Sequence, residues 1–326
     1  MKLWSSELKT LVLILLCVSL PVIFANINGT EISTVDWVYS QIFSDRSSLT
    51  HNPYREFNNF INRIILPEKL IGCIRDNFDV HTSYYILCYC RDLIAGTIVY
   101  WGTASIWHFA IYHVYVKQIF TDKGRPLPTT ETIVDQMILS QSSLFIYAGL
   151  PVVSELLIEN NFTKAYFYID EVGGWGYFWV YFVLYIACVE LGIYWMHRTL
   201  HTNKFLYKYV HGLHHKYNQA LTLTPWASIA FNPLDGILQA SPYVIFLLFI
   251  PVHYFTHVFM LFFSGIWATN IHDAVWGDTE PIMGAKYHTM HHTHFHYNFG
   301  QFFTFCDQIF GYTIDLKSTV KSQYHV

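Results

Sequence analysis

The sequence predicts an all-α fold, a polytopic integral membrane helical bundle with a histidine-rich cap on its cytosolic side. The 326-residue chain is 53% hydrophobic and only 13% charged, and it contains several apolar runs long enough to cross a bilayer. Aromatic residues make up 18% of the chain, and many lie near the ends of these runs, as they do at membrane interfaces. Thirteen of the eighteen histidines fall between residues 197 and 296, which gathers possible metal ligands in one part of the chain.

The N-terminal segment 1–30 is predicted to be either a signal peptide or an N-terminal anchor. Its apolar stretch, Leu11 to Phe24, follows two lysines and is short for a membrane span. In either case the sequon Asn28-Gly29-Thr30 would reach the lumen and accept a glycan. We expect the rest of the chain to comprise a mostly extramembrane segment (31–83), the membrane domain (84–315) and a C-terminal tail (316–326).

Four apolar segments form the predicted bundle. Leu93 to Val116 and Trp175 to Met196 are the clearest spans, and the lysines and arginines after each place both following loops in the cytosol. The chain must therefore cross once between them, which favours spanning by Met137 to Ile158 over an interfacial position, although polar residues interrupt that segment. Ile237 to Thr269 is too long for one span, and Pro242 and Pro251 suggest that it forms a hairpin.

Nine histidines are candidate metal ligands, and eight of them have the spacing of such ligands. Residues three or four apart share one face of a helix, so a pair four apart and two HxxHH triplets can each present their rings together. One further histidine follows the apolar hairpin. The nine are His197 and His201, then His211, His214 and His215, then His272, and then His288, His291 and His292. Burying nine imidazoles without an ion to bind them would be energetically unfavourable. Nine ligands are too many for one metal ion but suit two.

Four more histidines lie near these motifs but do not share their spacing. His253 and His257 fall inside the apolar hairpin, where we favour packing around a pocket over direct ligation of a metal. His294 and His296 lie off the face of the second triplet, and we expect them to support the ligands from outside or to face solvent.

The position of the cluster indicates which metal it holds. Zinc has no redox chemistry and normally takes four ligands, whereas imidazole also suits iron, and a pair of irons can reduce dioxygen and attack an unactivated C–H bond. The ligands begin where one span ends and return after the hairpin. The site therefore lies at the membrane surface, and we expect its substrate to be a lipid.

The histidine motifs HRTLH, HGLHH and HTMHH, in this order, resemble the signature of the membrane fatty acid hydroxylase/sterol desaturase superfamily. The longer stretches VELGIYWMHRTLH, TNIHDAVWG and HHTHFHYNFGQFFTFCDQIFG are similar to sterol C-5 desaturases, also called lathosterol oxidases. The likeness covers roughly residues 55 to 315. It implies an enzyme of the endoplasmic reticulum that uses O2 and two iron ions, held by the nine histidines on the cytosolic side, to introduce a Δ5 double bond into a Δ7-sterol.

The resemblance also implies the source of electrons, NAD(P)H acting through a separate cytochrome b5 and its reductase. The chain has no HPGG haem motif and no GxGxxG turn after a strand, so neither carrier is part of it. Three roles fit its basic loop, which contains Lys204, Lys208 and Lys216. The loop would dock an acidic electron carrier, bind anionic lipid, or only keep this side of the chain in the cytosol. A net charge of −4 without a long basic run argues against nucleic acid.

Two departures from the family pattern concern residues beside the ligands. Asn232 stands where relatives often have histidine, and Cys306-Asp307-Gln308 stands where they commonly have WDR. Both departures spare the nine histidines, so they bear on substrate and partner details.

Two acidic residues are predicted to support the ligands from outside. Glu190 lies seven residues before His197 inside a span, where an acid needs a partner, and the free N–H of a ligating imidazole would serve; the alternative is a role in helix packing. Asp273 follows His272, and its alternative role is to cap the local turn.

Two other functions fit the same pattern. One is a different lipid oxidase of the superfamily, such as a sterol C-4 methyl oxidase or a lipid hydroxylase. The other is a histidine-based metal transporter, which should line a continuous path through the spans, whereas the nine histidines lie just outside the predicted spans.

Overall fold

The computed structural model describes residues 52–218, 222–273 and 275–314, and within these ranges the regular elements are helices. The predicted signal peptide or anchor, the sequon and the C-terminal tail lie outside the described residues. The α-helices are α3 (Pro53–Ile65), α4 (Glu68–Asn77), α5 (Val80–Phe109), α6 (Val116–Ile119), α7 (Thr130–Tyr147), α8 (Gly149–Glu159), α9 (Trp175–Thr202), α10 (Lys204–Leu206), α11 (Pro233–Leu247), α12 (Tyr254–Ile271), α13 (Ala285–His294) and α14 (Phe305–Phe310).

Capping residues in the sequence determine where several helices begin. Asp79 accepts hydrogen bonds from two backbone N–H groups at the start of α5, and Thr129 accepts one at the start of α7. Asn232 caps α11 through Leu234 N, and Pro233 occupies the first helical position. Each side chain satisfies backbone donors that have no partner within the helix. The residue that departs from the family pattern, Asn232, therefore has a structural role.

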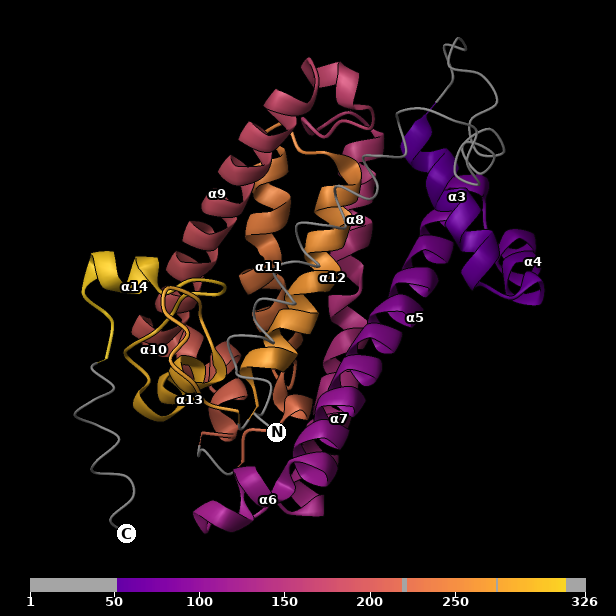
Figure 1. Ribbon diagram of the computed structural model, residues 1–326. Helices are drawn as coiled ribbons and strands as arrows, with labels where there is room; N and C mark the ends of the chain where they lie inside the picture. Colours follow the sequence, from indigo (N-terminus) through magenta and orange to yellow (C-terminus); the bar gives the residue numbers. More distant parts are fainter. Residues whose placement is uncertain (1–51, 219–221, 274, 315–326) are drawn as a thin grey trace.

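The long helices run alongside one another, and the histidine-bearing segments gather toward one end of the bundle (Figure 1). Helix α11 packs against α9, and α12 packs against α5. The largest hydrophobic cluster is built from α9, α11 and α12, with Tyr185, Tyr243 and Trp267 among its buried members. Helix α11 packs against both α9 and α12, and the histidine-proximal ends of these two helices carry or adjoin predicted ligands.

Within the part of the chain that the structure describes, two apolar helical stretches have the length and hydropathy to cross a membrane, Thr130–Glu159 and Trp175–Thr202. They contain the predicted spans Met137–Ile158 and Trp175–Met196. The predicted span Leu93–Val116 is continuous only as far as Phe109, because a π-helical turn, Ala110–Val114, follows α5.

The apolar hairpin is present as two helices, but one of its predicted breaks is wrong. Helix α11 continues through Pro242, and the chain turns only around Pro251, before α12 begins at Tyr254. Pro242 is buried against α9, where it faces Gly192. Packing between the helices thus accommodates a proline that local propensity disfavours.

We predict that Gly192→Ala destabilises the protein. A Cβ at this position would lie 2.9 Å from Pro242 Cβ and 3.0 Å from Phe246 Cε2, so α9 and α11 would have to move apart at a cost of about 1–3 kcal/mol. Thermal unfolding in detergent should show a lower midpoint. Gly176→Ala is the matched control, because a Cβ at Gly176 on the same helix meets no atom within 4 Å; equal midpoints for the two variants would contradict this account of the packing.

Candidate metal centre

All nine predicted ligands are buried and gathered at one end of the bundle, although they come from four separate segments of the chain. His197 and His201 lie in the last two turns of α9, and His272 directly follows α12. A π-helical turn (Tyr207–His211) and a 3-10 turn (His214–Lys216) carry the first HxxHH triplet, and α13 carries the second.

The nine rings form two groups. Within each group, the potential ligand atoms all lie within 4.8 Å of one another. The five-histidine group contains His197, His201, His211, His215 and His291, and the four-histidine group contains His214, His272, His288 and His292. The groups share a wall, because the rings of His215 and His292 are stacked with centroids 4.5 Å apart.

The expectation that each HxxHH triplet presents its three rings together is wrong, because each triplet is divided between the two groups. In α13, His288 and His292 are about one turn apart on one side, whereas His291 is rotated by about 100° from His292. In the first triplet, the chain changes from a π-helical to a 3-10 turn after His211, and His214 consequently leaves the group of its neighbours.

The Nε2 atoms of the rings approach one another closely. In the five-histidine group, the Nε2 atom of His201 lies 2.9 Å from that of His211 and 3.1 Å from that of His291. In the four-histidine group, the Nε2 atom of His272 lies 3.4 Å from that of His214 and 3.1 Å from that of His288. Two nitrogens that each bind one ion at about 2.1 Å are about 3.0 Å apart at a right angle and about 3.4 Å apart at the tetrahedral angle.

Hydrogen bonds on the opposite side of several rings decide which nitrogen carries the proton. The Nδ1 atom of His211 lies 2.8 Å from Asp235 Oδ2, and that of His291 lies 2.8 Å from the carbonyl oxygen of Tyr297. A carboxylate or carbonyl oxygen only accepts, so each Nδ1 donates, and in the neutral ring Nε2 keeps a lone pair. His197 and His272 are held in the same way, by the carbonyl oxygens of Phe299 (3.0 Å) and Ala268 (2.7 Å).

These lone pairs require a positive charge between them. His211 and His291 both direct an Nε2 lone pair at Nε2 of His201, which has at most one proton to donate when it is neutral. Nε2 of His197, in the same group, is buried and has no hydrogen-bond partner among the described residues. A metal ion would bind these nitrogens together, so the residues present fit a metal in this group.

Burial keeps the rings neutral. The pKa values of the clustered histidines beyond the helical spans lie well below the ordinary value, because burial and the neighbouring imidazoles disfavour the charged form; these are His214, His215, His288, His291 and His292. Burial lowers the pKa of His272 to about 4. Neutral imidazole is the form that binds metals.

Glu190 is buried, but its expected contact with an imidazole is wrong. Its carboxylate accepts hydrogen bonds from three consecutive backbone N–H groups, those of Gln301 (3.0 Å), Phe302 (2.9 Å) and Phe303 (3.2 Å). Glu190 therefore reaches the histidines only through the loop that contains Phe299, whose carbonyl oxygen accepts from His197.

A second acid, which sequence reasoning missed, holds the same loop. Asp307 Oδ1 and Oδ2 accept from the N–H groups of Phe299 (2.8 Å) and Gly300 (3.0 Å), and burial raises the pKa of Asp307 to about 6. The signal that could have found it is an acid within the apolar stretch FFTFCDQIF.

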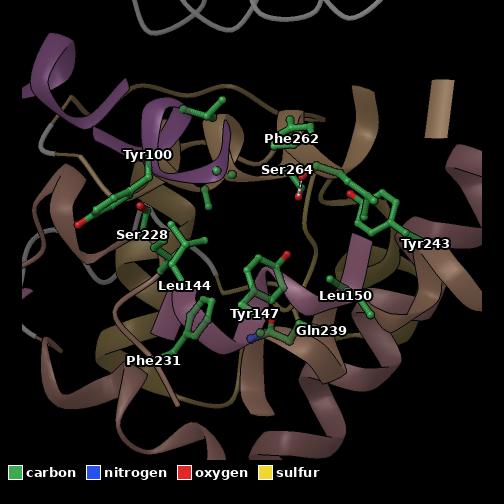
Figure 2. Close-up of a pocket in the computed structure, with 18 of the residues that line it drawn as sticks. Tyr100, Leu144, Tyr147, Leu150, Ser228, Phe231, Gln239, Tyr243, Phe262 and Ser264 are labelled. Carbon is green, nitrogen blue, oxygen red and sulfur yellow. Dashed lines mark hydrogen bonds between the residues drawn. The ribbon is translucent and has the colours of Figure 1, made fainter. Parts of the chain in front are cut away.

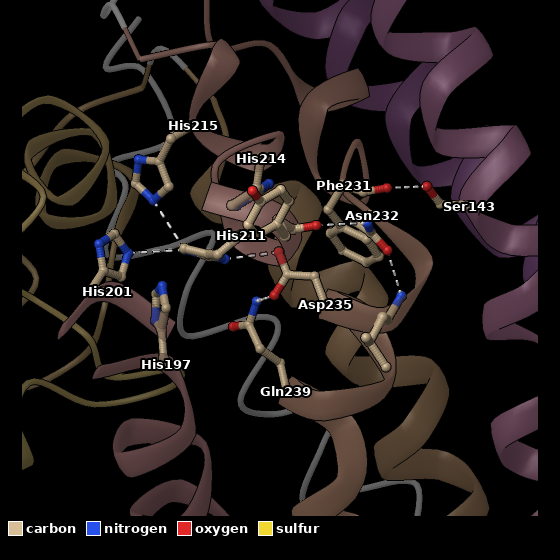
Figure 3. A network of polar contacts seen from close by, with 12 residues as sticks. Ser143, His197, His201, His211, His214, His215, Phe231, Asn232, Asp235 and Gln239 are labelled. Atoms are coloured by element: carbon tan, nitrogen blue, oxygen red, sulfur yellow. Dashed lines mark hydrogen bonds and ion pairs between the residues drawn. The ribbon is translucent and has the colours of Figure 1, made fainter. Parts of the chain in front are cut away.

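The other predicted acid, Asp273, accepts from Val275 N at 2.7 Å, as the turn-capping alternative describes. The acid that contacts a clustered ring directly is Asp235, which sequence reasoning also missed. Figure 3 shows it between His211 and Gln239, whose Nε2 donates to Asp235 Oδ1 at 2.8 Å. The sequence feature that could have identified Asp235 is a carboxylate directly before the apolar hairpin, where an acid needs a partner.

The remaining nearby histidines lie outside both groups. The Nδ1 atom of His257 is 3.0 Å from the hydroxyl of Tyr185, and His253 packs against the ring of Tyr166. His294 is half-buried and His296 is exposed. These positions agree with packing for the first pair and with an outer position for the second.

A largely apolar cavity lies between the helices of the bundle, and Figure 2 shows part of its lining. Residues of α5, α7, α8, α9, α11 and α12 line it. His214, His272 and His288 of the four-histidine group and His197 of the five-histidine group also line it. A molecule in this cavity would therefore contact rings of both groups.

Comparison with known proteins assigns the chain to a family. Residues 182–312 match the fatty acid hydroxylase family. A putative Delta(7)-sterol-C5(6)-desaturase of Arabidopsis thaliana is 40% identical over 253 residues, which cover 78% of this chain and 88% of the relative. A Delta(7)-sterol-C5(6)-desaturase of Nicotiana tabacum is 38% identical over 260 residues, covering 78% and 92%.

A Delta(7)-sterol 5(6)-desaturase of the fungus Gibberella zeae is 32% identical over 219 residues, covering 67% of this chain and 60% of the relative. No solved structure matches the chain. The two apolar stretches of spanning length agree with a membrane protein. The chain belongs to the fatty acid hydroxylase family and, within it, to the sterol C-5 desaturases, which are oxidoreductases.

Proposed function

We propose that this protein is a di-iron, O2-dependent sterol C5(6)-desaturase that introduces a Δ5 double bond into Δ7-sterols. The observation that carries the proposal is the apolar cavity that is lined by rings of both histidine groups. The names of the relatives support the choice of sterol and the position of the double bond.

The chemistry of the donor set supports two ions, with iron as the metal. Each group offers at least four imidazole nitrogens, and imidazole suits iron as well as zinc. Removal of hydrogens from an unactivated C–H bond needs a redox-active metal, a property that zinc lacks. We assign His197, His201, His211, His215 and His291 to one ion and His214, His272, His288 and His292 to the other.

When bound, the irons would supply the reduction of O2 that removes two hydrogens from the sterol. In the balanced reaction, the sterol loses two hydrogens and O2 is reduced to two waters, with two electrons and two protons from outside. The chain's own residues position the sterol and keep water out of the site. The apolar walls exclude water, and residues such as Ile193 and Ile229 hold the ring system beside the histidines.

The electrons would come from NAD(P)H by way of a reductase and cytochrome b5. Lys204 and Lys208 are exposed near the end of α9, close to the five-histidine group, and suit an acidic carrier. Lys216, by contrast, is paired with Asp135. We further propose that the chain is a multi-pass protein of the endoplasmic reticulum with its metal centre in the cytosol, and that residues 84–315 form its membrane domain.

Sterol profiling tests the proposed function directly. The chain would be expressed in a cell that lacks its own C-5 desaturase and accumulates Δ7-sterols. Appearance of Δ5,7-sterols is the expected result. A hydroxylated sterol, a product altered at C-4, or unchanged Δ7-sterol with detectable protein would contradict the proposed reaction.

Loss of one ligand from either group is predicted to abolish turnover. His291→Ala removes a ligand from the five-histidine group, and His214→Ala removes one from the four-histidine group. Both ions are needed, so Δ5,7-sterol formation should fall at least a hundredfold in each variant, while the amount of membrane-inserted protein changes little. His296→Ala, at an exposed ring outside both groups, is the control. Retained activity in both ligand variants would refute the ligand assignment.

Asp235→Asn is predicted to weaken metal binding about 10- to 100-fold, the usual effect of losing the partner of a ligating histidine. The amide keeps the shape of the side chain but removes the charge that fixes the Nδ1 proton of His211. Metal retention during dialysis against graded chelator measures the effect. Asp278→Asn changes an acid that is mostly exposed and should retain metal like the wild type; no difference between the two variants would exclude this role for Asp235.

Glu190→Gln is predicted to lower activity while leaving part of the metal bound. Both carboxylate oxygens accept from backbone N–H groups, so an amide would turn its NH2 group toward one of these donors and loosen the loop that holds His197. Glu171→Gln is the matched control. Among the described residues, the hydrogen bonds to Glu171 from the Phe167 and Tyr168 N–H groups both go to Oε1, and an amide oxygen can replace it. Wild-type turnover and metal content in Glu190→Gln would disprove the role.

A further inference from the structure

Three hydroxyl groups from three helices converge inside the apolar cavity. Tyr147 of α7, Tyr243 of α11 and Ser264 of α12 all line it. Figure 2 shows the two tyrosine hydroxyls directed toward the serine. Ser264 Oγ lies near both tyrosine hydroxyls and itself donates to the carbonyl oxygen of Leu261 at 2.7 Å. The three groups are called the hydroxyl cluster below.

The hydroxyl of Tyr243 is the unusual member of the hydroxyl cluster. The side chain is almost fully buried, with the residue 1% exposed, and its oxygen has no hydrogen-bond partner of normal geometry among the described residues. A buried hydroxyl without a partner destabilises the folded protein. This cost is removed if a ligand in the cavity brings a polar group to the same place.

The hydroxyl cluster lies at a fixed depth from the metal centre. Tyr243 is eight residues after Asp235 on α11, and Ser264 is eight residues before His272 at the end of α12. Eight residues of helix span about 12 Å. Because side chains on a helix tilt toward its N-terminus, Tyr243 leans back toward the histidines from this level.

The walls of the cavity indicate what kind of molecule the hydroxyl cluster would recognise. Around it the cavity is lined by apolar groups such as Leu150, Phe262 and Ala240. A ligand that fits must therefore be apolar along most of its length and carry one small polar group that both donates and accepts hydrogen bonds. A charged head group has no counter-charge within the hydroxyl cluster. An alcohol on a rigid hydrocarbon, which is the chemistry of a sterol, meets both requirements.

We propose that Tyr243, Ser264 and Tyr147 bind the hydroxyl group of the sterol and thereby determine which ring bond faces the histidines. The inference rests on the proposed function for the identity of the ligand. Tyr243 and Ser264 are positioning residues, because they hold the substrate at one end while the reacting bond lies beside the metal centre. A hydroxyl anchored at fixed depth prevents the ring system from sliding along the apolar walls, which alone provide little resistance to sliding.

Equilibrium binding tests this proposal without turnover. The purified full-length protein, with its metal, would bind a radiolabelled Δ7-sterol, and unlabelled Δ7-sterol or its 3-deoxy analogue would compete. For the wild type we expect the hydroxylated competitor to be about tenfold more effective, as one hydrogen bond predicts. Tyr243→Phe and Ser264→Ala should each bring the two competitors close together. Tyr177→Phe, at an exposed tyrosine of α9, should retain the wild-type ratio.

The outcomes separate this inference from the proposed function. Equal competition by the two sterols at the wild-type protein, or an unchanged ratio in both cavity variants, would overturn the hydroxyl-binding role. If Tyr243→Phe does not fold, Ser264→Ala alone decides. A chain that discriminates the hydroxyl but forms no Δ5,7-sterol in the profiling experiment would retain the binding subsite and lose the proposed reaction.

Discussion

The fold is organised around buried imidazole nitrogens whose lone pairs point toward one another. His211 and His291 both present Nε2 to His201 at hydrogen-bond distance, yet their protons are committed to acceptors on the opposite side of each ring. Without a cation, this arrangement combines the desolvation of neutral polar groups with repulsion between lone pairs. With a metal ion at the centre of each group, the same geometry becomes coordination, and metal binding contributes to folding.

Residues outside the two histidine groups hold the clustered rings in this geometry. Asp235 fixes the ring of His211, and the loop held by Glu190 and Asp307 provides the carbonyl oxygen that fixes His197. The helices that carry the ligands also enclose the apolar cavity, so a substrate is brought to the metals by the same packing that holds them. Stability, metal binding and substrate position therefore depend on common contacts.

The sequence predicted which histidines would gather but not how their rings are arranged. Spacings of three and four residues identified eight of the nine histidines, because such spacings place side chains on one helical face, and His272 was identified from its position after the apolar hairpin. The first triplet is divided because of the turn types around His211, which local propensity does not specify. The second is divided because His291 is rotated by about 100° from His292 on α13. Glu190 was selected correctly as a buried acid, but its partners lie more than a hundred residues away in a loop. Asp235 was missed because its partner depends on how α11 packs.

The central claim is that two groups of imidazoles hold two irons. Iron content and Mössbauer spectra of the purified, iron-replete full-length protein test it most directly. The account predicts about two irons per chain, in nitrogen-rich environments that differ because one group offers five rings and the other four. A protein that contains a single iron, or that is fully active with zinc alone, would contradict the account.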